Sequence, residues 1–342
     1  MQQLSLGIDW GTQFSQVFGL GDGGEIVLEE RVRTLDELAW RALLERLRTR
    51  GYLIHAGFEI GAQYDWLHDL LKEYCAEVSV IEPSHFAIIG KSQRKTDKID
   101  ACKIAEGIRR GDLPTVFIPP KQTRADRRLV AFVHWHSQQS SRVKGKLRSL
   151  LLMYRLECPY SNVGGSKARA WLNEQSVKMD AVGQLVLTDL LAQLDLLVSQ
   201  RKNLDARVKE RAKSYEQAEL LDSVPGLGAL GILAVLSSIA GIGRFERPDR
   251  LASYFGVCGS VHQSGQSLRN GPLTKRGNVH VRWLLSQALQ HLHKKDARAK
   301  KRYDKLRRKK PRGVARAAQV RWLANVLWYV LTRNEAYRCK AA

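Results

Sequence analysis

Alternating apolar and polar segments in the first 120 residues predict a mixed α/β domain. The strand-like segments are Leu4–Leu20, Glu25–Val32, Leu53–Phe58 and Glu77–Ile81. The segments with helical spacing of apolar residues are Leu35–Arg50, Tyr64–Tyr74 and Thr96–Arg110. The glycine-rich turn Gly21–Gly24 separates the first two strands, as in a hairpin. A strand–hairpin–strand unit followed by helix, strand, helix, strand and helix is the order of a ribonuclease-H-like fold.

The pattern becomes purely helical from Lys121 onward, and we expect a basic helical region over residues 121–219. One helix covers Lys121–Tyr154, and Gly164-Gly165 interrupts the pattern. A seam at alternating spacings of three and four then comprises Leu187, Leu190, Leu194, Leu197, Arg201, Leu204, Val208, Arg211 and Tyr215. Such a seam indicates either a helical hairpin packed inside one chain or a coiled-coil helix for self-association.

A compact, glycine-rich and mainly α-helical domain is expected over residues 220–342, ending in an amphipathic helix at Val314–Thr332. The stretch Ser223–Gly243 has no charged residue, but Pro225 and five glycines interrupt it. We interpret it as a soluble helix pair and not as a membrane span. The N-terminal residues do not resemble a signal peptide, so we expect a cytoplasmic, nucleoid-associated protein that makes no use of a membrane.

The charge balance narrows the class of partner. The chain has 56 Lys and Arg against 34 Asp and Glu, a formal net charge of +22. Thirteen of the basic residues fall between Lys294 and Arg316, where there are only two acids. A solvated charged face would explain such a run, but its density favours contacts with nucleic-acid phosphates. The five cysteines form no CxxC pair, which argues against a disulfide framework and a zinc site.

Basic residues at helical spacing and in the tail are the candidate nucleic-acid contacts. In the middle helices they are Arg124, Arg127, Arg128, Lys144, Lys146 and Arg148. In the C-terminal domain they are Lys275, Arg276, Arg282, Arg307, Arg308, Lys309 and Lys310. No zinc-finger pattern or similar base-reading module is recognisable, so we expect contacts with the nucleic-acid backbone and its shape.

Four carboxylates are candidates for a metal site in the first domain. Asp9 and Glu59 each follow a predicted strand, and Asp97 and Asp100 share one face of a predicted helix. Singly, an acid at a strand end is a common turn former, and an acid pair on a helix is a common solvated cap. Together, four acids would repel one another, and a divalent cation relieves that repulsion. Ligands that are all oxygens suit Mg²⁺ or Mn²⁺, the ions that assist phosphodiester cleavage.

A serine in the C-terminal domain is the candidate nucleophile. Ser264 precedes a glycine in a segment followed by basic residues that could neutralise a phosphate, and Ser260 and Ser267 are nearby alternatives. A serine beside glycine is more often part of a turn. The segment Ser223–Gly228 has the form of a helix-hairpin-helix turn, which could grip a phosphate or be a purely structural connection.

The motifs GIDWG, GFEIG and KTDKIDA, in this order and spacing, resemble the acid tetrad of the DEDD transposases of bacterial insertion sequences. That family is related to the Piv-type DNA invertases and has a RuvC-like N-terminal domain. The segments VPGLG, RFERPDRLASYFGV, QSG and LTKRGN are similar to its second conserved domain. The resemblance covers roughly residues 4–118 and 220–335, whereas the middle helices match only in character.

The resemblance implies a DNA recombinase with a composite site. The tetrad of one protomer would hold Mg²⁺, and Ser264 of another would attack DNA and form a phosphoserine link. It further implies a structured non-coding bridge RNA that pairs with donor and target DNA, and dimers that associate into a tetramer. Two other classes stay open: a RuvC-like metal-dependent endonuclease for branched DNA that uses no serine chemistry, and a non-catalytic nucleic-acid packaging protein.

Overall fold

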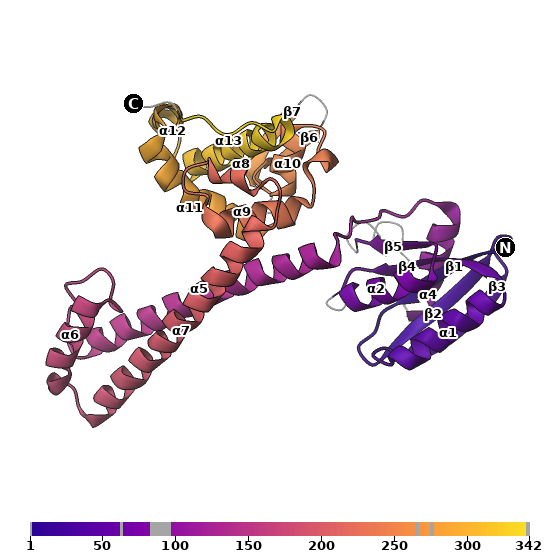
Figure 1. Cartoon of the computed structure of the whole chain (residues 1–342), viewed down its shortest axis with the longest axis horizontal. Coiled ribbons are helices and arrows are strands. Elements are labelled where there is room, and N and C mark those ends of the chain that lie inside the picture. The colour runs from indigo at the N-terminus through magenta and orange to yellow at the C-terminus, as the bar shows by residue number, and fades with distance from the viewer. Residues whose placement is uncertain (1, 62–63, 83–96, 265–266, 274–276, 340–342) are drawn as a thin grey trace. The chain divides into compact units, whose positions relative to one another are not determined.

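The computed structural model describes residues 2–61, 64–82, 97–264, 267–273 and 277–339. Within this part the chain divides into two compact units, Met1–Pro119 and Pro120–Ala342. Unit 1 is a mixed α/β domain, and unit 2 is helical apart from one β-hairpin (Figure 1). The expected α/β class of the N-terminal part and the helical class of the rest are therefore confirmed. A separate domain for the middle helices stays a prediction.

Unit 1 is built on a five-stranded mixed sheet. Its strands are β1 (Gln2–Asp9), β2 (Phe14–Gly21), β3 (Ile26–Arg33), β4 (Tyr52–Glu59) and β5 (Glu77–Ile81). Their order across the sheet is β3-β2-β1-β4-β5. The strands β1, β2 and β3 form an antiparallel meander, whereas β4 and β5 run parallel to β1. The parallel strands are joined through helices, as parallel pairing requires.

The first predicted strand is wrong in its length, because Leu4–Leu20 is two strands. The segment Trp10–Gln13 turns the chain between β1 and β2, and Leu4 pairs with Gly21. A run of 17 residues is longer than strands usually are, and Gly11 lies at the turn. The apolar residues on either side of the turn are buried, but Gly11, Thr12 and Gln13 between them mark the break in the sequence.

Each face of the sheet is covered by a different set of helices. Side chains alternate between the two faces of a strand, so Leu4, Leu6 and Ile8 point to one face of β1, and Gly7 and Asp9 to the other. The first face forms a buried core with Trp40, Leu43 and other residues of α1 (Glu37–Thr49) and α2 (Tyr64–Tyr74). The second face packs against α4 (Asp97–Arg110), whose Ala101 and Ala105 contact Phe18 and Leu20.

Contact between α4 and β1 depends on a residue without a side chain. A Cβ atom at Gly7 would lie 2.1 Å from the carbonyl oxygen of Ala101 and 2.5 Å from the backbone nitrogen of Ala105. Both atoms belong to the helix backbone and cannot rotate away. The glycine therefore sets how closely α4 approaches the sheet.

We expect Gly7→Ala to lower the free energy of unfolding of the full chain by about 3 kcal/mol, because α4 must move off β1. Urea denaturation measures the change. Gly61→Ala is the matched control, since a Cβ at Gly61 would meet nothing within 4 Å and its φ is not in the left-handed region. Equal stability of the two variants would contradict this description of the contact.

Unit 2 begins with two long helices that form a hairpin (Figure 1). They are α5 (Lys121–Met153) and α7 (Ala181–Lys213), connected through α6 (Ser166–Gln175) and the 3₁₀ turn η1 (Ser176–Lys178). Leu187 and Leu194 of the predicted seam are buried against Leu147 and Leu151 of α5. Further along, Arg211 donates two hydrogen bonds to the buried carboxylate of Asp126, at 2.8 and 3.0 Å. The seam thus packs inside one chain over these residues.

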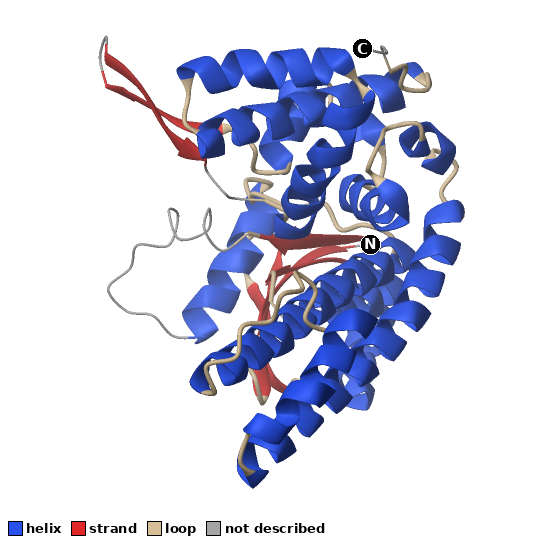
Figure 2. Cartoon of the chain, turned by 90° about the vertical axis from the view of Figure 1, so that its left-hand side faces the viewer, coloured by secondary structure: helices blue, strands red, loops and turns tan. Residues whose placement is uncertain are grey.

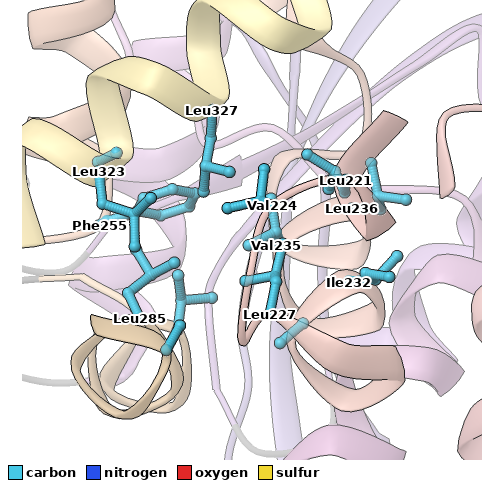
Figure 3. Close-up of a cluster of buried hydrophobic side chains, with 14 of the residues drawn as sticks. Leu221, Val224, Leu227, Ile232, Val235, Leu236, Phe255, Leu285, Leu323 and Leu327 are labelled. Carbon is cyan, nitrogen blue, oxygen red and sulfur yellow. The ribbon is translucent and has the colours of Figure 1, made fainter. Parts of the chain in front are cut away.

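The core of unit 2 gathers residues from almost all of its remaining helices (Figure 3). These elements are α8 (Ala218–Asp222), α9 (Gly228–Ile239), η2 (Ile242–Arg244), α10 (Pro248–Tyr254), α11 (Val279–Lys295), α12 (Ala297–Lys309) and α13 (Arg312–Arg333). Leu221, Leu233, Phe255, Leu285 and Leu323 are fully buried in it. The uncharged stretch around α9 is therefore core, and α9 has only 12 residues.

The predicted helix-hairpin turn lies between α8 and α9. Gly226 has φ +84°, and a Cβ there would lie 2.7 Å from the carbonyl oxygen of Ala288 in α11. The turn is thus packed against α11, which explains its glycine without a phosphate. Among the described helices, α7 alone is long and apolar enough to cross a membrane, with 17% of its most apolar window buried. A single helix that passes on length and composition is a weak indication.

Candidate functional site

Two of the four predicted acids are neighbours at one edge of the sheet, the one formed by the carboxyl ends of its parallel strands. Asp9 ends β1 and Glu59 ends β4, and the two parallel strands pair Ile8 with Phe58, directly before these acids. Gly7 pairs with Gly57, so Asp9 and Glu59 point to the same face, the one that α4 covers. Neighbouring strands lie about 4.8 Å apart. The register therefore brings the two carboxylates out side by side.

Helix α4 carries the other two acids toward the same edge. Its middle packs on Gly7, and its last turn approaches the β2–β3 turn, where a Cβ at Gly24 would lie 3.6 Å from Cζ of Arg109. Gly24 lies at the opposite end of the sheet from Asp9, because Leu4 pairs with Gly21. The helix thus runs antiparallel to β1. Its first turn, with Asp97 and Asp100, lies at the end where Asp9 emerges.

The acids differ in their surroundings. The Asp100 side chain is 19% exposed, and its Oδ1 lies 3.8 Å from Nζ of Lys103, one turn further along α4. Asp97 is exposed at the start of the helix. Within the described residues, no three His, Cys, Asp or Glu side chains form a group that could hold a metal ion.

The loop that follows Asp9 is held in place on both sides. The Trp10 ring stacks on Trp40 at 6.0 Å between centroids and lies 5.7 Å from Trp66. Thr34 donates a hydrogen bond of 2.9 Å from its Oγ1 to the carbonyl oxygen of Gly11. A cavity of about 710 Å³ borders this loop, and its lining includes Arg33 as well as Asp36 and Glu37. The contacts of Trp10 and Thr34 fix the loop that follows Asp9 on the α1 side of the sheet.

The candidate nucleophile lies on a β-hairpin of unit 2. Strands β6 (Gly259–Ser264) and β7 (Ser267–Leu273) are antiparallel, and they extend away from the helices (Figure 2). Gly259 pairs with Leu273 near the helices, and Ser264 pairs with Ser267 at the far end of the paired residues. The side chains of both serines lie outside the described part of the chain. Ser264 thus has a backbone position at the distal end of this hairpin.

Two family profiles match the chain, and both describe transposases. A DEDD transposase profile of IS110 matches residues 6–155, which include all four acids. A second profile, described as the transposase IS116/IS110/IS902 family, matches residues 218–304, which include Ser264. The chain belongs to the IS110/IS116 family of DEDD transposases. It is therefore an enzyme of DNA transposition, and membership in a DEDD family implies a divalent metal ion.

Curated relatives agree with the assignment of the transposase to this family. This chain is 27% identical to a transposase for insertion sequence element IS1111A of Coxiella burnetii, over 98% of this chain and 92% of the relative. It is 23% identical to the putative transposase y4pF/y4sB of Sinorhizobium fredii, over 98% of this chain and 86% of the relative. A probable family 20 transposase of Pseudomonas aeruginosa is 26% identical over 46% of this chain.

Two of the basic residues that we expected to contact nucleic acid serve the interior of the transposase. Arg124 is 4% exposed. Arg127 donates hydrogen bonds of 2.8 and 2.6 Å to the carbonyl oxygens of Ser237 and Ser238, in the last turn of α9. Those carbonyls have no partner further along the helix, and a cation there is favoured by the helix dipole. Because of these internal contacts, neither residue belongs to the proposed nucleic-acid surface. The spacing along α5 did not show which face of the helix is buried.

The other candidates divide into three groups. Arg282 donates to the carbonyl oxygens of Phe255 and Gly277, so it ties down the segment before α11, and burial lowers its pKa. Lys275 and Arg276 lie outside the described residues. The candidates with exposed or half-exposed side chains are Arg128, Lys144, Lys146, Arg148, Arg307, Arg308, Lys309 and Lys310. Of these, Arg148 and Arg307 also donate to nearby backbone carbonyls.

A basic cavity between α11 and α12 is lined by lysines of the basic run that are not among the individual candidate contacts. It has a volume of about 550 Å³, and its cationic lining residues are Lys294, Lys295, Lys300, Lys301, Lys305 and Arg308. The helical spacing of Lys301, Lys305 and Arg308 could have indicated this shared face. The expected tail contacts Arg307, Lys309 and Lys310 lie on the same helix or directly after it. Cations that converge on one hollow favour an anionic ligand.

Asp296 holds α12 and the C-terminal segment in place. Its buried carboxylate caps α12 by accepting from the backbone nitrogens of Arg298 and Ala299, and it accepts a 2.6 Å hydrogen bond from Tyr337. Burial opposes ionisation of this carboxyl group, but its hydrogen bonds outweigh that effect and lower its pKa to about 2. The charged carboxylate is thus a stabilising group at neutral pH.

We expect Asp296→Asn to lower the free energy of unfolding by about 2 kcal/mol at neutral pH. The folded-state pKa lies below the unfolded one, so this contribution is complete above the ordinary aspartate pKa and is lost as the pH falls through about 2. Denaturation at several pH values should show the difference between wild type and variant shrinking in acid. Asp304→Asn, on the surface beside Lys300, should cost less than about 1 kcal/mol.

Proposed function

We propose that this transposase cuts and rejoins DNA with a RuvC-like, Mg²⁺-dependent acid tetrad and a serine nucleophile. The observation that carries the proposal is the shared face of Asp9 and Glu59 on neighbouring parallel strands, with the first turn of α4 at the same end of the sheet. A sheet order of β3-β2-β1-β4-β5, with an antiparallel meander first, supports a ribonuclease-H or RuvC type of fold. We propose that Asp97 and Asp100 supply the other two carboxylates of the tetrad.

The donor set fits a hard divalent cation. The four side chains offer carboxylate oxygens only, which suit Mg²⁺ or Mn²⁺ better than zinc. When bound, such an ion would polarise the scissile phosphate and stabilise charge on the attacking and leaving oxygens. Asp9 and Glu59 would bind from the sheet, and Asp97 and Asp100 would complete the site from α4.

The serine step is a transesterification. The Oγ atom of Ser264 attacks the scissile phosphorus, a P–Oγ bond forms, and the bond to the leaving deoxyribose oxygen breaks. The serine proton passes to the leaving oxygen. The bond energy is kept in the phosphoserine link, so a second DNA hydroxyl can reverse the exchange and join a new strand. A hairpin that extends from its helices supports delivery of Ser264 to the acids of another protomer.

The partners in this proposal are donor and target DNA, a structured guide RNA and further copies of the chain. The positive charge of the chain supports nucleic acids as its partners, since the net charge is +22 and the lysines of the basic cavity lie together on α11 and α12. A bridge RNA would choose the sites by base pairing, which fits a protein that contacts mainly backbone. We propose dimers that form a tetramer, located in the cytoplasm at the nucleoid.

A recombination assay tests the proposal as a whole. The full chain, the RNA transcribed from its own insertion element, and donor and target DNA are incubated with Mg²⁺. We expect joined DNA products that disappear with EDTA. A RuvC-like endonuclease would give cut but unjoined strands, and a packaging protein would give neither; either result would overturn the proposal.

A further inference from the structure

An exposed aromatic pair lies on the outer face of α5. Phe132 is 50% exposed and Trp135 is 49% exposed, and their rings stack with centroids 5.3 Å apart and planes at 23°. Two exposed rings in contact form a continuous apolar surface, and such a surface marks a binding site more often than a single exposed side chain does. Two rings already stacked, one turn apart on a helix, form a rigid apolar platform.

Basic residues extend this platform along the helix. Arg128, Phe132, Trp135, Gln139, Arg142 and Lys146 follow one another at alternating spacings of four and three. That spacing places all six on one stripe of α5, about 27 Å long. Apart from the half-exposed Gln139, their side chains are exposed.

The opposite side of α5 is the one that the rest of unit 2 covers. Val130, Val133 and Leu147 are buried there, and Asp126 binds Arg211 of α7. Asp126 is the only acidic residue in the sequence of α5, and its side chain is 2% exposed. Among the residues of α5 itself, the outer stripe therefore carries aromatic rings and basic side chains but no acid.

We infer that this outer stripe binds an unpaired stretch of nucleic acid, with a base stacked on Trp135 and Phe132 and the flanking phosphates beside Arg142 and Lys146. The charge decides between occupants. A protein partner would suit the rings, but a second copy that paired through the same stripe would bring the basic residues of the two stripes together. A paired duplex would present phosphates but hide its base faces. Single strands present both, and stacking on aromatic rings tolerates any base.

This inference rests on the proposed function, because it names a contact of the same nucleic-acid partners. The unpaired base could belong to a loop of the guide RNA or to a DNA strand opened during exchange, and the chemistry of the contact is the same for both. Binding can be measured without Mg²⁺ and without strand transfer. Failure of the recombination assay would thus leave this result interpretable.

The experiment uses the full chain and two short single-stranded probes in EDTA. One is an oligouridylate that carries 5-iodouridine, and the other is an oligothymidylate that carries 5-iododeoxyuridine. Irradiation couples such bases to aromatic rings that they stack on. We expect the crosslink in the tryptic peptide Leu129–Arg142, at Trp135 or Phe132. The probe that couples more strongly identifies the RNA or the DNA source.

Variants give the matched affinity test. Trp135→Ala should weaken single-strand binding about tenfold, and Trp135→Phe should restore most of it. Tyr329→Ala, at a ring that is 43% exposed on α13, should leave binding unchanged. Arg142→Gln should lower the slope of log affinity against log salt by about one.

Three results would overturn the inference. The first is unchanged affinity in Trp135→Ala when circular dichroism shows the variant is folded. The second is a crosslink map that lacks the peptide Leu129–Arg142. The third is a change of oligomeric state in Trp135→Ala, seen by sedimentation, with unchanged nucleic-acid affinity, which would assign the stripe to a protein interface.

Discussion

Asp9→Asn is expected to reduce DNA strand cleavage by about a thousandfold or more. The substitution keeps the shape of the side chain but removes the charge of the acid that β1 places beside Glu59. Loss of one carboxylate from a divalent-metal site removes several kcal/mol of transition-state stabilisation, and about 4 kcal/mol corresponds to that factor. Cleavage of end-labelled donor DNA in single-turnover reactions measures the loss.

The matched control for Asp9 is an acid at the other end of the same sheet. Asp22 lies exposed in the turn between β2 and β3, so Asp22→Asn changes the net charge equally without touching the site. We expect its cleavage rate to match wild type, and both variants to bind DNA as tightly as wild type. An Asp9→Asn protein that still cleaves at the wild-type rate would exclude a catalytic role for this edge of the sheet.

Ser264→Ala is expected to abolish joined products while nucleic-acid binding persists. The alanine has no oxygen to attack phosphorus, so the phosphoserine link cannot form and the bond energy of the cut strand is not conserved. Gel analysis of joined and cut strands distinguishes the two outcomes. Ser260→Ala and Ser267→Ala are the controls, since both residues lie on the same hairpin. If Ser264→Ala still joined strands but one of the two control variants did not, the serine replaced in that control would be the nucleophile.

Sequence patterns predicted the existence of the elements in unit 1 better than their limits. Helix Tyr64–Tyr74 and strand Glu77–Ile81 agree with the structure in both bounds. The break at Trp10–Gln13 was missed, although Gly11, Thr12 and Gln13 mark it in the sequence. The close packing of α4 on Gly7 could not be foreseen either, because it depends on which glycine meets which backbone atom.

Prediction was weakest where one residue type serves two purposes. An arginine on a basic helix can contact phosphate or fill the interior, and spacing alone does not say which. Arg127, which we expected on the nucleic-acid surface, binds the end of α9, whereas Arg211 of the predicted seam binds Asp126. Phe132 and Trp135 are the reverse case, since aromatic residues at helical spacing suggest a core but lie exposed. Only the tertiary partners of α5 separate its two faces.

The most direct test of the central claim is to trap the protein–DNA link. Donor DNA with a radiolabel at the scissile strand is incubated with the full chain, guide RNA and Mg²⁺, quenched in detergent, and resolved by denaturing electrophoresis. We predict a labelled, protease-sensitive adduct with wild type, whose labelled peptide contains Ser264, and no adduct with Ser264→Ala or Asp9→Asn. Efficient DNA joining by wild type without any such adduct, or an adduct of equal yield in Ser264→Ala, would contradict the claim.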